Sequence, residues 1–311
     1  MVLSWLLFQQ IAKLFLMILA GFILTRRGLL KREDARGISV ILMYLVNPSV
    51  IFRAFETSAA KERLPGFFFS IAAALAVHAV LFLLEPLMKR RLGMDRVERA
   101  GVIYMNCGNM IVPIVNELFG REWLVYSIAF MAVQNLFIWT HLISSLSGER
   151  TIRLKKVVTN PNIIAVFAGI GCMLASFHVA PVIGEAMDSM GGMIGPASML
   201  VAGVLMGSAD LKAIFGRPRL LLTAALRLIV TPLILLPGFC LARRFFPSAE
   251  GGTLLTILYI VTLAPTATTV VTLAQVCDCD AEYASSVNIL TTLACIVTMP
   301  AMIALYQFLA G

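Results

Sequence analysis

Two stretches of the sequence combine a proline with neutral polar side chains inside otherwise apolar segments. The residues that stand out are Asn106, Asn109, Pro113, Pro265, Thr266 and Thr268. A proline removes a backbone hydrogen bond and collides with the preceding turn, so each proline is expected to break a helix. Amide and hydroxyl groups beside such breaks can bind an anion or water without carrying charge, or they can only cap the broken ends.

The composition places these stretches in a membrane protein. The chain has 311 residues, of which 59% are hydrophobic and 14% charged, and its mean hydropathy is +0.90. These values lie well outside the range of soluble domains and predict an all-α integral membrane protein in contact with the lipid bilayer. The net charge of +8 comes from short basic runs between apolar segments, which is typical of cytoplasmic loops, so we expect no nucleic-acid partner.

Ten apolar segments are long enough to cross a bilayer, which takes about 20 helical residues. They cover residues 3–24, 37–55, 66–87, 98–118, 123–145, 161–178, 184–207, 219–242, 252–275 and 282–308. Most of the 25 lysines and arginines fall in four clusters, within residues 26–36, 89–99, 150–156 and 212–219. Because basic loops face the cytoplasm, this pattern predicts ten transmembrane helices with both termini outside.

Three landmarks recur at nearly one spacing. They are Pro48 with Pro196, 148 residues apart, Pro113 with Pro265, 152 residues apart, and Arg90-Arg91 with Arg243-Arg244, 153 residues apart. We therefore expect two five-helix repeats, residues 1–155 and 156–311. Five is an odd number, so the second repeat is inverted relative to the first. Chance alignment is the alternative, since proline is frequent in membrane helices.

An inverted pair of broken helices would bring the two interruptions together near mid-membrane. Each break exposes backbone N–H groups with positive dipole character at one half-helix and carbonyls at the other. Lipid cannot satisfy these groups, so they must face protein or a water-filled cavity, which is the natural place for a substrate.

Other polar residues inside the apolar segments are candidates for the same region. Asn47, before Pro48, either lines the entrance to the cavity or satisfies a kink. Gln134, Asn135 and Asn288 are candidates to support the breaks, and the alternative for each is an ordinary interhelical hydrogen bond.

Ionisable residues inside membrane spans are candidates for coupling because their burial is costly. Arg227 could pair with a carboxylate, relay charge during coupling, or extend to the membrane interface. His78 and His141 could couple transport to protons or be satisfied by neighbours. Lys13 could face a bundle interior or water.

The sequence contains no signature of an enzyme or of a metal site. P-loop, dinucleotide-binding and zinc-type motifs are absent, and Cys277-Asp278-Cys279-Asp280 lacks a full ligand set. We therefore expect no catalytic residues, no cofactor and no bound metal.

Four motifs, in this order and spacing, resemble the auxin efflux carrier family, which includes the plant PIN proteins and many bacterial members, some associated with malonate. The motifs are Asn47-Pro48-Ser49-Val50-Ile51-Phe52-Arg53, Gly108-Asn109-Met110-Ile111-Val112-Pro113, Asn135-Leu136-Phe137-Ile138-Trp139-Thr140 and Leu263-Ala264-Pro265-Thr266-Ala267-Thr268. The similarity covers essentially the whole chain. The long hydrophilic central loop of plant PINs is absent, so regulation through such a loop and auxin itself as the substrate are not supported.

The resemblance implies a fold shared with bile-acid symporters and sodium/proton antiporters, in the plasma (inner) membrane. Spans 1, 2, 6 and 7 would form a scaffold that makes a homodimer, and spans 3–5 and 8–10 a mobile transport domain in which helices 4 and 9 cross. Substrate would meet the crossing at Asn109, Pro113 and Pro265.

The expected function is secondary transport of a small organic anion, a malonate- or auxin-like carboxylate, by an elevator-type movement. The alternatives are a membrane sensor or binding protein that uses the same cavity, and a cation-coupled symporter of another substrate class.

Overall fold

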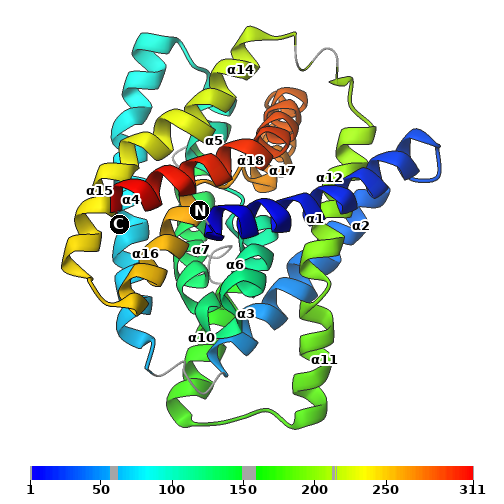
Figure 1. Cartoon of the computed structure of the whole chain (residues 1–311). Helices are drawn as coiled ribbons and strands as arrows, with labels where there is room; N and C mark the ends of the chain where they lie inside the picture. The colour runs from blue at the N-terminus through cyan, green and yellow to red at the C-terminus, as the bar shows by residue number, and fades with distance from the viewer. Residues whose placement is uncertain (1, 57–61, 149–158, 212–213, 215, 311) are drawn as a thin grey trace.

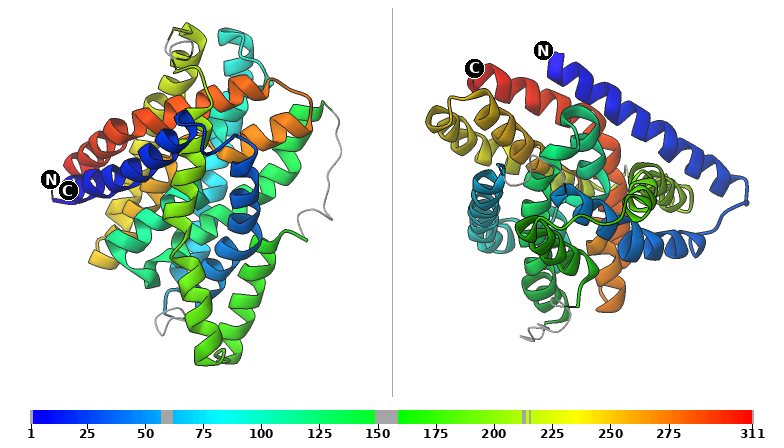
Figure 2. Two further views of the ribbon diagram at one scale, coloured as in Figure 1. Left: turned by 90° about the vertical axis from the view of Figure 1, so that its right-hand side faces the viewer. Right: turned by 90° about the horizontal axis from the view of Figure 1, so that it is seen from below.

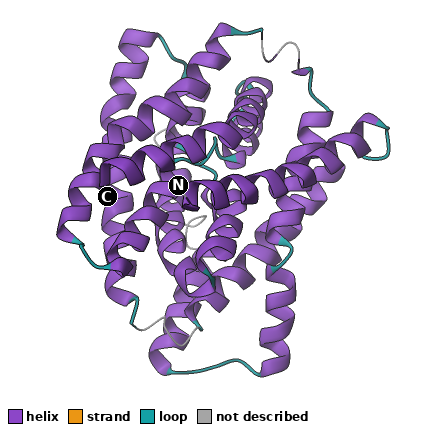
Figure 3. Ribbon diagram, in the orientation of Figure 1, coloured by secondary structure: helices purple, strands orange, loops and turns teal. Residues whose placement is uncertain are grey.

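A computed structural model describes residues 2–56, 62–148, 159–211, 214 and 216–310. The regular secondary structure of the described residues is entirely helical, with helices joined by loops (Figure 3). The only extended pairing among these residues is one isolated β-bridge. Seven of its helices are long and apolar enough to cross a membrane, and three other apolar helices are shorter. The predicted all-helical membrane fold is confirmed at this level. The expected junction at residue 155 and the basic cluster at 150–156 lie outside the described residues.

The helices of the first half follow in chain order (Figure 1). They are α1 (Val2–Arg26), α2 (Asp34–Ile41), η1 (Leu42–Val46), α3 (Asn47–Phe55), α4 (Leu64–Leu92), α5 (Arg96–Ile103), η2 (Cys107–Ile111), α6 (Val112–Phe119), η3 (Arg121–Trp123), α7 (Leu124–Phe137), η4 (Ile138–Leu142) and α8 (Ile143–Ser147).

The second half continues with helices that tend to be longer. They are α10 (Pro161–Ala175), α11 (Pro181–Gly191), α12 (Ile194–Gly207), α14 (Pro218–Ala225), η5 (Leu226–Val230), α15 (Thr231–Phe245), α16 (Ala249–Thr262), α17 (Thr268–Val276) and α18 (Ala281–Ala310).

The prediction that Pro113 breaks its helix is wrong. Pro113 is the second residue of α6, and the helix runs through it from Cys107 to Phe119. The π-helical turn η2 directly before it explains why, because the Val112 N–H donates to the carbonyl of Cys107, five residues back. The wider turn separates the proline ring from the carbonyls before it.

The same device appears twice more, at Pro48 and at Pro232. The residue before each proline, Asn47 or Thr231, again donates its N–H to a carbonyl five residues back, within η1 and η5. The structure therefore passes these three prolines by local widening of the helix, and the real chain breaks lie elsewhere.

One group of helices consists of α1, α2, α3, α10, α11 and α12. The α1 helix packs along α12, and α3 packs against α10 and α11. The α1 and α12 backbones approach closely because Gly21 of α1 and Gly203 of α12 each face the other helix. A Cβ atom at either position would overlap backbone atoms of that helix. Small residues at such contacts are the usual basis of tight helix packing in membranes.

The second group contains α4–α8 and α14–α18, which pack mainly against one another. The two broken segments, α5–α6 and α16–α17, belong to this group, and α6 also contacts α1 and α12 of the first group. The groups also touch where α1 runs beside α18, so both termini lie together (Figure 2), and the Ser4 hydroxyl donates to the Gln307 side chain.

Candidate functional site

The two chain breaks cross each other in the buried centre of the molecule. The first covers Tyr104–Asn106, between α5 and η2, and the second covers Leu263–Ala267, between α16 and α17. The Asn106 N–H donates to the Pro265 carbonyl at 2.8 Å, and the Ala267 N–H donates to the Tyr104 carbonyl at 2.9 Å. This short antiparallel pairing lets each break satisfy part of the other's backbone, as a water-poor interior requires.

Side chains from neighbouring helices complete the hydrogen bonding at the centre of each break. The Gln134 amide, on α7, donates to the Met105 carbonyl at 2.7 Å and accepts from the Met105 N–H at 3.1 Å. On the other strand the Asn288 amide, on α18, donates to the Thr266 carbonyl at 2.6 Å. The Thr266 N–H donates to the Thr291 hydroxyl at 3.1 Å. Met105 and Thr266 are bridge partners, so the two breaks are supported in related ways.

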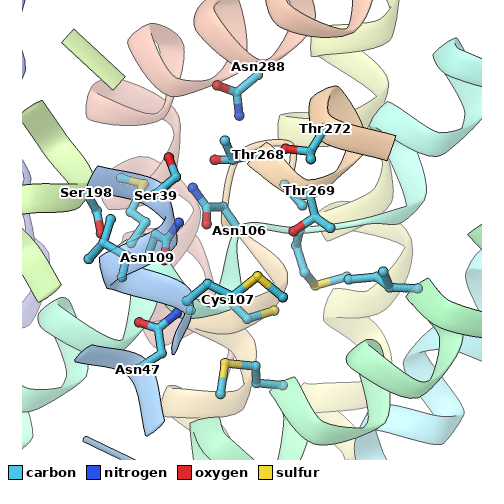
Figure 4. A pocket seen from close by; sticks show the side chains of 18 of the residues that line it. Ser39, Asn47, Asn106, Cys107, Asn109, Ser198, Thr268, Thr269, Thr272 and Asn288 are labelled. Carbon is cyan, nitrogen blue, oxygen red and sulfur yellow. The ribbon is translucent and has the colours of Figure 1, made fainter. Parts of the chain in front are cut away.

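A cavity of about 300 Å³ lies against the crossing. Its polar lining comes from both helix groups and consists of Ser39, Asn47, Asn106, Asn109, Gln134, Asn135, Asn160, Asn162, Ser198, Thr268, Thr269, Thr272, Asn288 and Thr292. Figure 4 shows Ser39, Asn47 and Ser198 on one side of this space and Thr268, Thr269 and Thr272 on the other. Among the described residues that line the cavity there is no Asp, Glu, Lys, Arg or His.

Two half-helices begin at the cavity without side-chain caps. The segment Cys107–Phe119 starts after Asn106, and α17 starts after Ala267, and neither preceding residue caps the first turn with its side chain. The first N–H groups of a helix have no partner within the helix and carry about half a positive charge together. The two N-termini therefore contribute positive partial charge at the cavity, although no cationic side chain lines it among the described residues.

Three buried polar atoms in the cavity wall lack a protein partner. The side-chain oxygens of Asn47 and Asn162 and the Ser198 hydroxyl have no hydrogen bond within the described part of the chain, and Ser198 is only 4% exposed. Leaving such a group unsatisfied costs about 1–3 kcal/mol. All three atoms are thus available to a ligand or to water in the cavity.

Arg227 contacts backbone carbonyls at the helix ends that precede the two breaks. Its side chain is fully buried, so it does not extend to the membrane interface. Its Nε donates to the Ala264 carbonyl at 2.9 Å, its Nη1 donates to the Val102 carbonyl at 3.0 Å, and its Nη2 donates to the Thr262 carbonyl. No ion pair with a carboxylate joins these bonds among the described residues.

The two histidines occupy different surroundings, and neither lines the cavity. His78 is fully buried, with Nδ1 at 2.8 Å from the Ala74 carbonyl. His141 lies between Tyr104 and Glu85, with Nδ1 at 2.9 Å from the tyrosine hydroxyl and Nε2 at 3.0 Å from a carboxylate oxygen. His141 therefore links the first break to the Glu85–Arg99 ion pair.

The residues singled out from the sequence divide into three sets by position. Those that line the cavity are Asn47, Asn106, Asn109, Gln134, Asn135, Thr268 and Asn288. Pro265 and Thr266 lie buried in the second break, and Pro113 packs beside Gly195, outside the cavity lining. Arg227, His78 and His141 lie outside the lining as well. Sequence reasoning missed Ser198, although it comes two residues after Pro196, a landmark of the proposed repeat.

Helices that cross a membrane, broken at a central polar cavity, define this chain as a membrane transporter. The family model described as "Membrane transport protein" matches residues 6–152 and 149–303. The chain belongs to this family, the auxin efflux carrier or PIN-like family. It is also similar to an uncharacterized transporter of Methanothermobacter thermautotrophicus (strain Delta H), with 24% identity over 306 residues, which cover 94% of this chain and 96% of that protein.

Proposed function

We propose that the protein is a secondary transporter that binds a small organic anion at the crossing of the two breaks. The observation that carries this proposal is the cavity itself, in which two uncapped helix N-termini meet neutral amides and hydroxyls and no charged side chain among the described lining residues. Helix N-termini favour anions because their N–H groups and dipoles point at the ligand.

The size and charge of the cavity narrow the substrate class. A volume of about 300 Å³ lies at the lower end for ligand pockets, which suits a small mono- or dicarboxylate. Two helix N-termini supply about one positive charge in total. A transported anion must also leave, and dipoles and amides bind it more weakly than a buried lysine or arginine would.

The architecture that we propose is ten transmembrane helices in two inverted repeats of five, residues 1–155 and 156–311. On this assignment α1, α2–α3, α10 and α11–α12 are spans 1, 2, 6 and 7, the scaffold. The remaining helices form the transport domain, with α5–α6 and α16–α17 as the broken spans 4 and 9. The packing into two helix groups supports this division. We further propose that scaffolds pair in a homodimer in the inner membrane.

The cavity lies between the two groups, as an elevator mechanism requires. Asn47 and Ser198 belong to scaffold helices, whereas Asn106, Asn109 and Thr268 belong to the broken helices of the transport domain. Sliding the transport domain along the scaffold would carry the second set, with the bound anion, away from the first.

The two ends of the cavity differ in a way that supports alternating access. One end extends to Ser39, Leu205 and Val276. Ser39 and Leu205 are close in sequence to the basic clusters at residues 26–36 and 212–219, so we assign this end to the cytoplasm. Toward the other end, ion pairs of Asp188 with Arg53 and Arg121 join α11, α3 and the segment after α6. The structure thus fits a state open to the cytoplasm, with both termini outside.

The test is transport by purified protein in liposomes, with labelled mono- and dicarboxylates and an imposed voltage gradient. A negative interior would drive efflux of a monoanion by about 2.3 kcal/mol per 100 mV. Asn109→Ala removes an amide from the cavity and should abolish saturable binding without loss of folding. Asn116→Ala is the matched control, because Asn116 is exposed on the same half-helix and does not line the cavity.

Two results would contradict the proposal. If no carboxylate binds the wild-type protein, the assignment to organic anions is wrong. If carboxylates are transported but Asn109→Ala transports them as fast as Asn116→Ala does, the substrate site is not at the crossing.

A further inference from the structure

The C-terminal ends of two half-helices converge on a single buried guanidinium group. The α5 helix ends at Ile103 and α16 ends at Thr262, immediately before the two breaks. The last carbonyls of a helix lack partners within the helix and carry about half a negative charge together. Arg227 donates to carbonyls at both ends. These are the carbonyl of Val102 in α5, that of Thr262, the last residue of α16, and that of Ala264, two residues after α16.

The charges at this junction balance. Two helix C-termini contribute about one negative charge in total, which matches one guanidinium. A buried charge needs compensating polar contacts. This match explains how Arg227, which is fully buried, is tolerated without a carboxylate partner among the described residues. The π-helical turn η5, which contains Arg227, is a local irregularity of the kind that often marks functional positions.

Carbonyls at unwound helix ends are also the groups with which secondary transporters coordinate a coupling cation. Here the donors of Arg227 already occupy three of these carbonyls. A guanidinium remains charged at all physiological pH values and cannot dissociate from the chain. Arg227 also lies in the helix group that contains both breaks, so it would move together with the crossing.

We propose that Arg227 is a built-in cation that takes the place of a dissociable coupling ion, and that removing it creates a requirement for an added cation. Arg227 is a positioning residue, because it acts through the carbonyls of the breaks and does not line the cavity. The bidentate and branched donors of arginine are needed to reach carbonyls of two separate helix ends, so a lysine can supply the charge but not all of the contacts.

The first arm of the test measures thermal unfolding of the purified protein in sodium chloride, choline chloride and guanidinium chloride, each at the same millimolar concentration. The wild-type midpoint should be the same in the first two salts and should not rise with guanidinium. Arg227→Ala should lower the midpoint, and sodium or guanidinium should restore part of the loss whereas choline should not. A midpoint for Arg227→Ala that equals the wild-type value, or that no small cation raises, would overturn the proposal.

The second arm remains informative if Arg227→Ala does not fold. The wild-type protein and Arg227→Lys are compared for carboxylate transport with sodium or choline on both sides of the membrane. Both should transport at rates that do not depend on sodium, and a loss of wild-type transport in choline would overturn the proposal.

This arm rests on the proposed function, and the two can fail separately. Absence of carboxylate transport in every salt contradicts the proposed function alone, because the unfolding measurements need no substrate. Transport that requires sodium contradicts the role of Arg227 alone.

Discussion

The contact between Arg121 and Asp188 provides a direct test of movement between the two helix groups. Asp188, on α11, accepts hydrogen bonds from Arg53 at 3.0 and 2.9 Å and a further bond from Arg121. Arg53 and Asp188 both belong to the proposed scaffold, whereas Arg121 lies between α6 and α7, in the proposed transport domain. Of the contacts made by Asp188, only the one with Arg121 joins the two proposed domains, so this contact must break when the outer side opens.

The variant Arg121→Gln removes this contact and leaves the pair within the scaffold in place. The side chains of Arg121 and Asp188 are 35% and 34% exposed, so solvent screens their attraction and the pair contributes about 0.5–1 kcal/mol. This free energy corresponds to a change of about two- to fivefold in the ratio of outward-open to inward-open molecules.

The assay is the labelling rate of a cysteine at Val50 by a membrane-impermeant maleimide, in a variant whose native cysteines have been replaced. Val50 lines a small cavity beside Arg121 and Asp188 on the proposed outer side. Arg121→Gln should raise the labelling rate about two- to fivefold, because a larger fraction of molecules opens to the outside.

The control is Arg63→Gln. Arg63 pairs with Glu250 at 3.4 Å, and both residues belong to the proposed transport domain, so their contact does not change when that domain slides. The reasoning would be refuted if Arg121→Gln labelled no faster than the parent, or if Arg63→Gln accelerated labelling to the same degree.

Two further predictions concern stability and are checked by thermal unfolding in detergent. Gln134→Leu leaves the Met105 N–H buried without a partner, while the Met105 carbonyl keeps the hydrogen bond from the Cys107 N–H, and the change should cost about 1–3 kcal/mol. Asn135→Ala, at a cavity position without such bonds, should cost much less, and equal effects would contradict the role given to Gln134. Gly203→Ala places a Cβ atom against the Ile18 carbonyl and should destabilise by about 1–3 kcal/mol or more. Gly171→Ala, where a Cβ atom meets open space, should be neutral, and an equal loss there would contradict the close α1–α12 contact.

The sequence was sufficient to predict the membrane fold because apolar length and composition determine it locally. The same holds for the polar residues near the breaks, since an amide such as Gln134 or Asn288 inside an apolar helix needs a partner. The position of the first break could not be read from Pro113, because a wider turn lets the helix pass a proline. In the second break the proline does lie within the interruption, where the Pro265 carbonyl accepts from the Asn106 N–H and the proline has no N–H of its own that would need an acceptor.

The surroundings of Arg227 and Ser198 could not be derived from the sequence at all. The partners of Arg227 are backbone carbonyls at residues 102, 262 and 264, and any residue type supplies a carbonyl. Only the crossing in three dimensions brings them to one guanidinium. Ser198 is a small polar residue in an apolar helix, and its place in the cavity depends on how the two helix groups face each other.

The crossing separates the partial charges of four helix ends into two places with different partners. The carbonyl ends of α5 and α16 face Arg227, which is part of the chain, and the N–H ends of η2–α6 and α17 face the cavity. If Arg227 balances the carbonyl ends, the positive charge of about one unit at the N–H ends remains for the anion. A cation at the carbonyl ends also reduces their repulsion of an anion held nearby. The cavity can therefore attract a carboxylate with neutral side chains alone, which bind weakly enough for the anion to be released on the other side.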